Sequence, residues 1–453
     1  MTKDMTHGKP MRLMLSFSLP ILIGNIFQQF YNMVDAIIVG QTIGANALGA
    51  VGATGALTFL VFGFMFGMAS GFSVIAAQRF GADDADGLRR SVATSVYLSI
   101  AVTVIVTAIS MLTARPLLEL MNTPEELIDD SFSYLIVIFA GTAALMFYNL
   151  LSGILRALGD SKTPLYFLIL SSLLNIALDL LLIIVYHCGV AGAAYATVIS
   201  QAVSAVLCFI YMMKKFPILH FHRRDWSLDT DAVLSQLRLG LPMALQSSII
   251  AIGVIVMQSG INCFGSTVVS AFTAASKVEQ IMTQPFVAIG TACATFAGQN
   301  LGAGRYDRIH QGAKASVILT VLSALASAAL VLLLGKGMMH LFLRADQSEA
   351  IRYGLRYLDI IIAFFLPLGL IFVFRSILQG VGKPFMPMMS GVIELVTRCV
   401  FTVLFARLAS YEGVCLSSPI AWVGAALPLV IAYLVWQRQT KNLTLPTQTE
   451  SRT

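Results

Sequence analysis

Long apolar runs separated by short polar segments make up most of this chain. A helix needs about 20 mainly apolar residues to cross a bilayer core, which is about 30 Å thick. Runs of that length recur from one end of the sequence to the other, and we expect each to form one transmembrane helix. The twelve predicted spans cover residues 13–40, 48–76, 90–113, 131–156, 163–187, 189–213, 234–262, 268–299, 311–335, 351–380, 385–409 and 414–437.

Composition supports a lipid environment. The chain has 453 residues, of which 57% are hydrophobic and only 11% are charged. Soluble domains carry about 25% charged residues, so this chain could not cover a water-exposed surface. Its apolar content is also too high for an intrinsically disordered protein. We therefore predict an all-α, multi-pass membrane protein that is embedded in the lipid bilayer.

The placement of the basic residues predicts an orientation. With the N-terminus inside, twenty-one of the 29 Lys and Arg residues fall in the tails and loops on the inner side, against six on the outer side. Inner loops of membrane proteins carry an excess of Lys and Arg. We therefore expect both termini to be cytoplasmic, with the protein in the cell membrane. The count also supports twelve spans, because one span more or fewer would destroy the alternation.

The two halves of the sequence resemble each other at an offset of 221–223. The matching pairs are Leu19-Pro20 with Leu241-Pro242, residues 76–82 (AAQRFGA) with 297–303 (AGQNLGA), and residues 154–159 (ILRALG) with 377–382 (ILQGVG). Six spans separate the members of each pair, so the repeats share one orientation. We predict a six-helix lobe (1–213), a basic linker (214–233), a second six-helix lobe (234–437) and a tail (438–453), with a central cleft between the lobes.

Charged and polar residues inside three spans of the first half point to function. A charged side chain at the bilayer centre costs roughly 2.5–3.5 kcal/mol on insertion scales, so it should face a cavity or a partner. The first span carries Asn25, Gln28, Asn32 and Asp35 on one helical face, because they are spaced 3, 4 and 3 residues apart. The fifth span carries Asn175 and Asp179, and the sixth carries Thr197 and Gln201.

We interpret Asp35, Asn175, Asp179 and Thr197 as a site for H⁺ or Na⁺. Burial favours the neutral carboxyl, which suits reversible protonation, and oxygen ligands suit Na⁺. The second half has Met257 where the first has Asp35, so the fold itself does not require the carboxylate. The alternative interpretation is hydrogen bonding between helices, which is common in membrane bundles.

Other residues are candidates for a substrate cleft or a hinge. Pro20 removes a helical hydrogen bond about four turns before Asp35 and is a candidate bending point. Aromatic side chains near polar residues can bind flat cations by stacking and cation–π contact. The candidate cleft residues are Asn25, Gln28, Phe30, Tyr31, Asn32, Gln201, Lys277, Gln280 and Gln284.

The sequence lacks the motifs of enzymes and of nucleotide-driven pumps. It contains no GxxxxGK[ST] phosphate loop, no HExxH and no Gly-x-Ser-x-Gly with triad partners. The six cysteines form no CxxC pair and are expected to be small core residues. We expect no enzymatic activity, no cofactor, no metal beyond Na⁺ and no nucleic-acid partner. Transport energy would come from an ion gradient.

The combination of these motifs resembles the multidrug and toxic compound extrusion (MATE) family over nearly the whole chain. It is most similar to the DinF-like branch, in which an Asp on helix 1, an Asn and Asp on helix 5 and a Thr on helix 6 form the ion site. The resemblance assigns those roles to Asp35, Asn175, Asp179 and Thr197, and the helix-bending role to Pro20. The NorM-like branch has acidic residues on helices 7 and 10, whereas this chain carries Ile250 at the helix 7 position.

The resemblance implies an antiporter that exports cationic, lipophilic compounds in exchange for H⁺ or Na⁺ by alternating access. We expect it to act as a monomer. The rival interpretation is a flippase for lipids or lipid-linked oligosaccharides, from a related branch of the same superfamily. A flippase is expected to have more cationic residues in its cleft, to bind phosphate, and here only Lys277 and Arg398 lie within spans.

Overall fold

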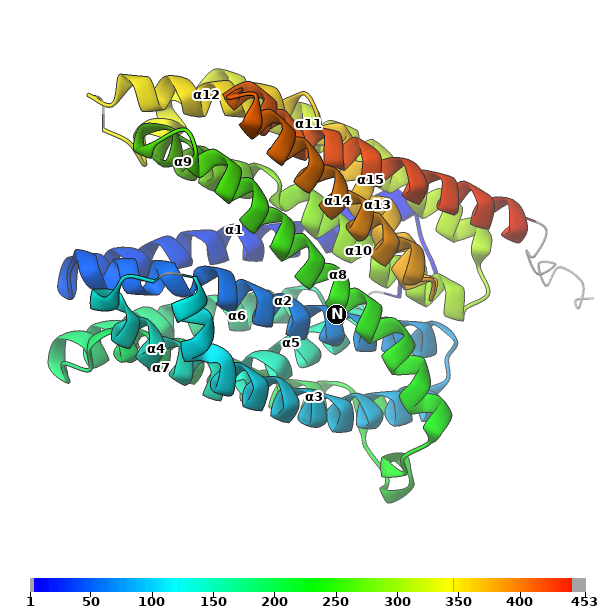
Figure 1. The fold of residues 1–453 in the computed structure, drawn as a ribbon. Helices are drawn as coiled ribbons and strands as arrows, with labels where there is room; N and C mark the ends of the chain where they lie inside the picture. Colours follow the sequence, from blue (N-terminus) through cyan, green and yellow to red (C-terminus); the bar gives the residue numbers. More distant parts are fainter. Residues whose placement is uncertain (1–3, 122, 345, 442–453) are drawn as a thin grey trace, which may run out of the picture. The chain divides into compact units, whose positions relative to one another are not determined.

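The computed structural model describes residues 4–121, 123–344 and 346–441, and these residues form helices joined by short loops (Figure 1). The α-helices are α1 (Pro10–Thr42), α2 (Ala45–Gly81), α3 (Ala85–Leu120), α4 (Glu125–Ala140), α5 (Thr142–Ala157), α6 (Lys162–Asp179), α7 (Gly189–Lys215), α8 (Thr230–Asn262), α9 (Ser266–Met282), α10 (Gln284–Gly302), α11 (Tyr306–His340), α12 (Ser348–Ile362), α13 (Phe365–Gly380), α14 (Phe385–Arg407) and α15 (Tyr411–Thr440). A π-helical turn (η1, Leu180–Val185) follows α6, and two 3₁₀ turns (η2, Pro217–Leu219; η3, Arg223–Trp226) lie before α8.

The helices account for the twelve predicted spans. Ten helical segments of the described chain are long and apolar enough to cross a membrane, and α9 with α10 counts as one of them. Two further pairs pass the same test as bent spans, α4 with α5 at 46° and α12 with α13 at 53°. Their outer surfaces suit lipid, since Leu112 of α3 and Leu333 of α11 are each 80% exposed. The protein is therefore an all-α membrane protein with up to twelve spans.

The chain packs into two compact units. Unit 1 contains Ile23–Ala76 and Asp84–Ala251, and unit 2 contains Asp4–Leu22, Ala77–Asp83 and the described residues from Ile252 onwards. The unit boundaries fall inside α1, α2 and α8. Since these units are defined by packing and not by the repeat, the lobe limits predicted at 1–213 and 234–437 stay a prediction.

In unit 1, helices α4, α5 and α6 pack against α7, and α2 crosses the first part of α8 at close range. The crossing depends on small residues spaced four apart on both helices. A Cβ atom on Gly67 would lie 2.5 Å from Ala244 Cα, and one on Gly71 would lie 2.4 Å from Gly240 Cα. Small residues at this spacing let two membrane helices approach closely.

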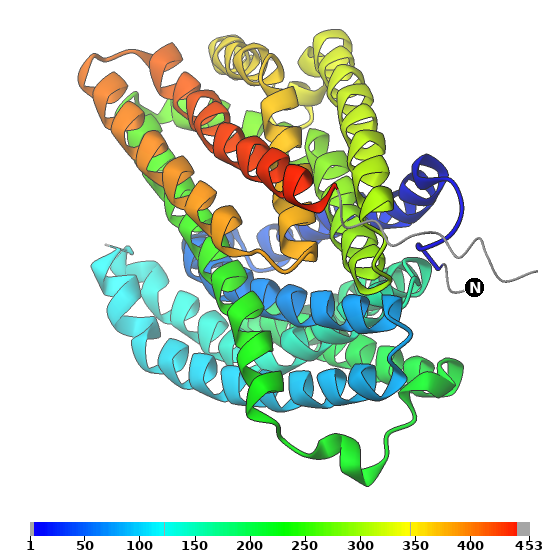
Figure 2. The same ribbon diagram turned by 90° about the vertical axis from the view of Figure 1, so that its right-hand side faces the viewer.

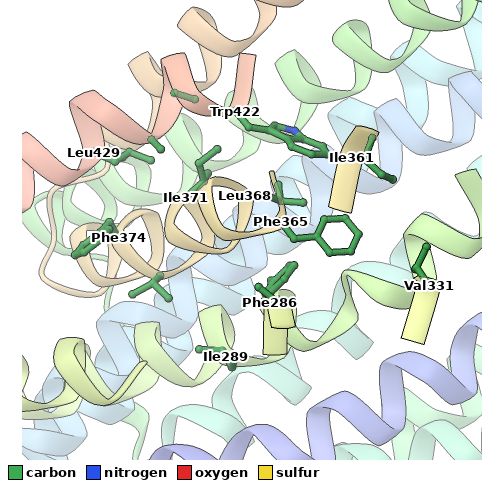
Figure 3. Close-up of a cluster of buried hydrophobic side chains, with 14 of the residues drawn as sticks. Phe286, Ile289, Val331, Ile361, Phe365, Leu368, Ile371, Phe374, Trp422 and Leu429 are labelled. Carbon is green, nitrogen blue, oxygen red and sulfur yellow. The ribbon is translucent and has the colours of Figure 1, made fainter. Parts of the chain in front are cut away.

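The core of unit 2 is built from large apolar side chains (Figure 3). They come from α10, α11, α12, α13 and α15, whose ribbons run from yellow-green to red in Figure 2. Phe286 and Phe365 meet edge to face, with their ring centroids 5.9 Å apart. The two copies of the Gln-x-x-Gly motif also lie in unit 2, in backbone contact. A Cβ atom on Gly81 would lie 1.9 Å from the Gln299 carbonyl oxygen, and one on Gly302 would lie 1.8 Å from that of Gln78. The repeated glycines are therefore needed for this close approach.

Candidate functional site

The four residues predicted as the ion site come together in unit 1. Asp35 lies on α1, Asn175 and Asp179 on α6, and Thr197 on α7. The carboxyl groups of Asp35 and Asp179 lie within hydrogen-bonding reach of each other. In one orientation of the Asn175 side-chain amide, both its nitrogen and its oxygen form hydrogen bonds. The nitrogen donates to Asp179 Oδ2 at 2.8 Å, and the oxygen accepts from the Thr197 backbone N–H at 3.0 Å.

The carboxyl pair is largely enclosed by protein. Asn175 and Asp179 are fully buried, and Asp35 is half-buried. Within the described residues, Oδ1 of Asp35 and Oδ1 of Asp179 have no hydrogen-bond partner, and neither carboxyl forms an ion pair with a basic residue. Two carboxyls can bond to each other only if one carries a proton, and two adjacent negative charges repel strongly. The pair therefore holds one proton or another cation more readily than none.

Two tyrosines complete the surroundings. The Tyr31 hydroxyl lies 3.3 Å from the Asn175 amide and also contacts the Thr197 side chain. Tyr134 of α4, which is not among the predicted site residues, is 9% exposed and interacts electrostatically with both Asp35 and Asp179. The one sequence signal for Tyr134 is that a tyrosine, Tyr357, stands at the matching position of the second repeat.

The helix carrying Asp179 changes its winding at the site. Helix α6 ends at Asp179, and the next six residues, Leu180–Val185, form the π-helical turn. Short π-helical segments are rare and occur often at functional sites. The wider turn has backbone hydrogen bonds between residues five apart, including one from the Tyr186 N–H to the Leu181 carbonyl at 3.1 Å.

The residues proposed to line a cleft are more scattered. Tyr31 belongs to the carboxyl site, whereas Gln28, Phe30 and Asn32 of α1 are exposed and Asn25 and Gln201 are half-buried. In unit 2, Lys277 and Gln280 of α9 are exposed, and the Gln284 side chain bonds to the Gln280 carbonyl at 2.9 Å. Pro20 is buried in the part of α1 that belongs to unit 2, and α1 stays helical through it. Their roles stay predictions.

Unit 2 has its own charged groups at membrane depth. Glu394 and Arg398 of α14 form an ion pair at 2.7 Å, which their i,i+4 spacing on one helical face allows. Arg375 of α13 joins the same carboxylate at 3.3 Å. Glu279 of α9 accepts a hydrogen bond from the Tyr357 hydroxyl at 2.6 Å. Among the described residues, no three His, Cys, Asp or Glu side chains gather into a metal-binding group.

Fold and site together define a class: a multi-pass helical membrane protein in two related halves, with a carboxyl pair at membrane depth in unit 1. The sequence profile of the MatE family matches residues 20–181 and again 242–404. The chain therefore belongs to the MATE family, which is a family of transporters and not of enzymes. Because one profile matches the two halves in turn over segments of nearly equal length, the match confirms the internal repeat.

Comparisons with individual proteins agree with the family. The probable multidrug resistance protein YpnP of Bacillus subtilis (strain 168) is 32% identical over 413 residues, which cover 91% of this chain and 92% of that protein. The FAD transporter of Shewanella oneidensis is 24% identical over 425 residues, covering 90% and 91%. The crystal structure of MATE in complex with MaL6 matches with a TM-score of 0.89 at 24% identity and covers 98% of this chain and 99% of its own. That likeness shows the fold.

Proposed function

We propose that this protein is a secondary antiporter that exports cationic, lipophilic small molecules in exchange for H⁺ or Na⁺ by alternating access. It acts in the cell membrane, with both termini in the cytoplasm. The observation that carries the proposal is the Asp35–Asp179 carboxyl pair, which lies at membrane depth without a basic partner. Intramembrane acids of this kind mark ion and proton pathways in transporters.

The chemistry of the pair suits exchange of one positive charge. A proton taken up by one carboxylate gives a neutral carboxyl that can donate to the other, and its release restores two repelling charges. Na⁺ would instead take carboxylate oxygens of Asp35 and Asp179, with further oxygens from Asn175 and Thr197. In either case the incoming ion removes negative charge, which weakens the site for a cationic substrate. Bending of α1 at Pro20 is the proposed route by which this change reaches the substrate.

The substrate class rests on two supports. The acidic site favours positively charged compounds, and YpnP carries the name of a multidrug resistance protein. The FAD transporter shows that a relative in the same family is named for an anionic substrate. The basic groups Arg375 and Arg398 of this chain, however, are already bound to Glu394. This pairing counts against an anionic substrate and also against the flippase alternative.

The driving force is sufficient for useful export. One monovalent ion crossing about 100 mV supplies about 2.3 kcal/mol. Since each 1.4 kcal/mol is tenfold in an equilibrium, a neutral one-to-one exchange sustains a substrate ratio of about fortyfold. Loss of the coupling group should therefore abolish accumulation against a gradient, even if downhill movement of substrate continues.

Asp35→Asn tests the proposal in proteoliposomes that contain a fluorescent lipophilic cation. Efflux is measured with a pH gradient and a Na⁺ gradient imposed separately. We expect the wild type to respond to one of the two gradients and Asp35→Asn to lose that response, so that its efflux is the same with and without the gradient. Asp130→Asn is the matched control, because it makes the same change at an exposed position of α4 in the same unit.

Two results would overturn the proposal. Full gradient-driven efflux by a correctly folded Asp35→Asn variant would remove Asp35 from coupling. Movement of a labelled lipid, with no export of the cation under either gradient, would support the flippase. The two gradients also decide between H⁺ and Na⁺.

A further inference from the structure

Glu279 lies about one turn before the junction of α9 and α10, within the single helical span of residues 266–302. Helix α9 ends at Met282 and α10 begins at Gln284, with Pro285 as its second residue. The Thr283 backbone N–H and hydroxyl both donate to the Glu279 carbonyl, at 2.9 Å and 3.0 Å, which closes the last turn of α9. Acidic side chains within membrane-spanning helices are rare and commonly mark ion or proton pathways.

Tyr357 of α12 holds the Glu279 side chain in place. Its hydroxyl donates to Glu279 Oε2 at 2.6 Å, the short distance expected of a charge-assisted bond. Tyr357 is 2% exposed, and its ring packs edge to face on Phe272 with the centroids 5.0 Å apart. The Glu279 side chain itself is half-buried. The tyrosine therefore fixes one carboxylate oxygen of a side chain that is only half-buried.

Glu279 differs from Glu394, the acid of α14, in how its charge is neutralised. Glu394 accepts from two guanidinium groups, Arg398 and Arg375, and so is neutralised permanently. No basic side chain of the described residues forms an ion pair with Glu279; the groups acting on it are the Tyr357 hydroxyl and, through space, Arg398. Lys277 is exposed and two positions away, so it does not face Glu279.

The neighbouring helices α10, α11 and α12 place no buried charged side chain near Glu279. Helix α10 has no charged residue, and α11 has none between Lys314 and Lys336. Asp359 and Arg356 of α12 are exposed, on either side of the buried Tyr357. The negative charge of Glu279 is therefore balanced only by the Tyr357 hydrogen bond and, through space, by Arg398.

The internal repeat gives an independent comparison. Tyr357 and Tyr134 occupy matching positions of the two repeats, and Tyr134 lies beside the Asp35–Asp179 pair. Both units thus place a buried tyrosine of a bent span next to a carboxyl group at membrane depth. Helices α2 and α9 also correspond, and when their first residues are aligned, Thr58 of α2 matches Glu279. The acid at this position is therefore specific to the second repeat.

We propose that Glu279, positioned by Tyr357, is a second site of reversible protonation, located in unit 2. A proton from water adds to Oε1 of the carboxylate and gives a neutral carboxyl, while Oε2 keeps the Tyr357 hydrogen bond. Release returns the proton to water and restores the charge, which Tyr357 and Arg398 stabilise. The proposal goes beyond the function proposed above and does not require Asp35 to be the coupling acid.

Infrared difference spectroscopy of the purified full-length protein, at acid minus alkaline pH, tests the site directly. Protonated carboxyls give a C=O stretching band, and we expect Glu279→Gln to remove one component of it. Glu412→Gln is the matched control, because Glu412 is an exposed acid already paired with Arg356 at 2.7 Å. The control should keep the component that Glu279→Gln removes. Tyr357→Phe should keep the Glu279 component but shift it to higher frequency, since the carboxyl loses a hydrogen bond.

Proton release on alkalinisation in weakly buffered detergent gives a second readout, and we expect one proton fewer from Glu279→Gln than from the wild type. Spectra and proton counts of Glu279→Gln that match the wild type would overturn the proposal. Weaker binding of a cationic substrate with an unchanged carboxyl band would also overturn it, because Glu279 would then bind substrate and not a proton. These measurements need no transport, so their result stands even if the antiport assay fails.

Discussion

At matching positions of the two repeats, unit 1 carries acids and unit 2 carries neutral groups. Asp35 corresponds to Met257 at an offset of 222, and Asp179 corresponds to Thr402 at 223. In unit 1, Oδ1 of each acid has no hydrogen-bond partner within the described residues. In unit 2 the Thr402 hydroxyl donates to Ser417 Oγ at 3.0 Å. A buried acceptor without a hydrogen-bond partner destabilises a fold. These positions are therefore less favourable to stability in unit 1 than in unit 2.

The comparison extends one turn along the same helices. Asn175 corresponds to Arg398, which is bound to Glu394 and lies against Gly253 of α8, where a Cβ would be 2.7 Å from Arg398 Nη1. Asn175 is neutral and leaves the Asp179 charge uncompensated, whereas Arg398 brings its own counter-charge. One scaffold therefore supports an exchangeable charge in one unit and a permanent ion pair in the other.

The largest expected effect is a difference in stability between two variants, each of which replaces one carboxylate by its amide in one unit. Glu394→Gln leaves Arg375 and Arg398 buried without a carboxylate, and breaking a buried pair in this way costs about 3–5 kcal/mol. Asp179→Asn removes a repelling charge and should leave stability unchanged or slightly higher. Thermal unfolding in detergent, followed by size-exclusion chromatography after heating, measures both.

The comparison would fail if Asp179→Asn lowered the melting temperature as much as Glu394→Gln. Such a result would mean that the Asp35–Asp179 pair is a structural contact, like the ion pair of unit 2. Asp130→Asn, at an exposed site, controls for the loss of a carboxylate alone.

The sequence was informative about the acids because charge within an apolar span is costly and therefore easy to see. Helical spacing alone placed Asn175 and Asp179 on one face, and the structure brings them to Asp35 and Thr197. The local sequence did not reveal Tyr134, since a single tyrosine in an apolar run has no distinguishing pattern. The orientation of Tyr134 depends on tertiary packing between α4 and α7, which no local pattern specifies.

The spans and the repeat also followed from hydropathy and motif spacing. The breaks near Gly141 and Phe364, which divide two spans into bent pairs, were not predicted. An interrupted helix keeps the same apolar composition, so hydropathy does not detect the break. For the same reason hydropathy could not show that the packing units change within α1, α2 and α8.

An intermediate effect is expected from exchanging threonine for valine in each unit. Thr402→Val removes the hydrogen bond to Ser417 and should cost about 1 kcal/mol of stability with transport unchanged. Thr197→Val removes the contact with the Tyr31 hydroxyl at the acidic site. A change of about 1 kcal/mol there is about fivefold in ion affinity, so we expect a several-fold fall in gradient-driven efflux. Equal effects of both variants on efflux would contradict the division of roles between the units.

The N-terminal segment, which precedes the first repeat, and the linker, which precedes the second, are bound to the helices by different interactions. In unit 2, Arg308 donates to the Met5 and Gly8 carbonyls at 3.0 Å and 2.9 Å, which are neutral acceptors. In unit 1, Arg89 forms an ion pair with Asp225 of the linker at 3.1 Å, and Asp225 is 1% exposed. The linker contact therefore depends on a carboxylate charge, whereas the N-terminal contact does not.

The smallest predicted effect follows from that carboxylate. Desolvation alone would raise the pKa of Asp225, but the His222 backbone N–H and the Arg89 charge outweigh it and hold the pKa below its usual range. A lowered folded-state pKa means that the contact stabilises the linker above pH of about 4 and is lost as pH falls through the folded-state value. With Trp422 and Trp436 replaced by Phe, Trp226 of η3 is the single remaining tryptophan, and its ring packs on Tyr97 with centroids 5.6 Å apart. Its fluorescence should change on acidification.

Asp225→Asn should abolish this pH dependence, because an amide does not titrate, and should leave Trp226 in its low-pH state at neutral pH. Asp86→Asn is the control, since Asp86 also pairs with Arg89 but has a side chain that is 51% exposed. An exposed pair contributes little, so that variant should keep the wild-type pH profile. If Asp225→Asn and the wild type titrate alike, the linker is held by its apolar contacts, and the two segments that precede the repeats do not differ in their dependence on charge.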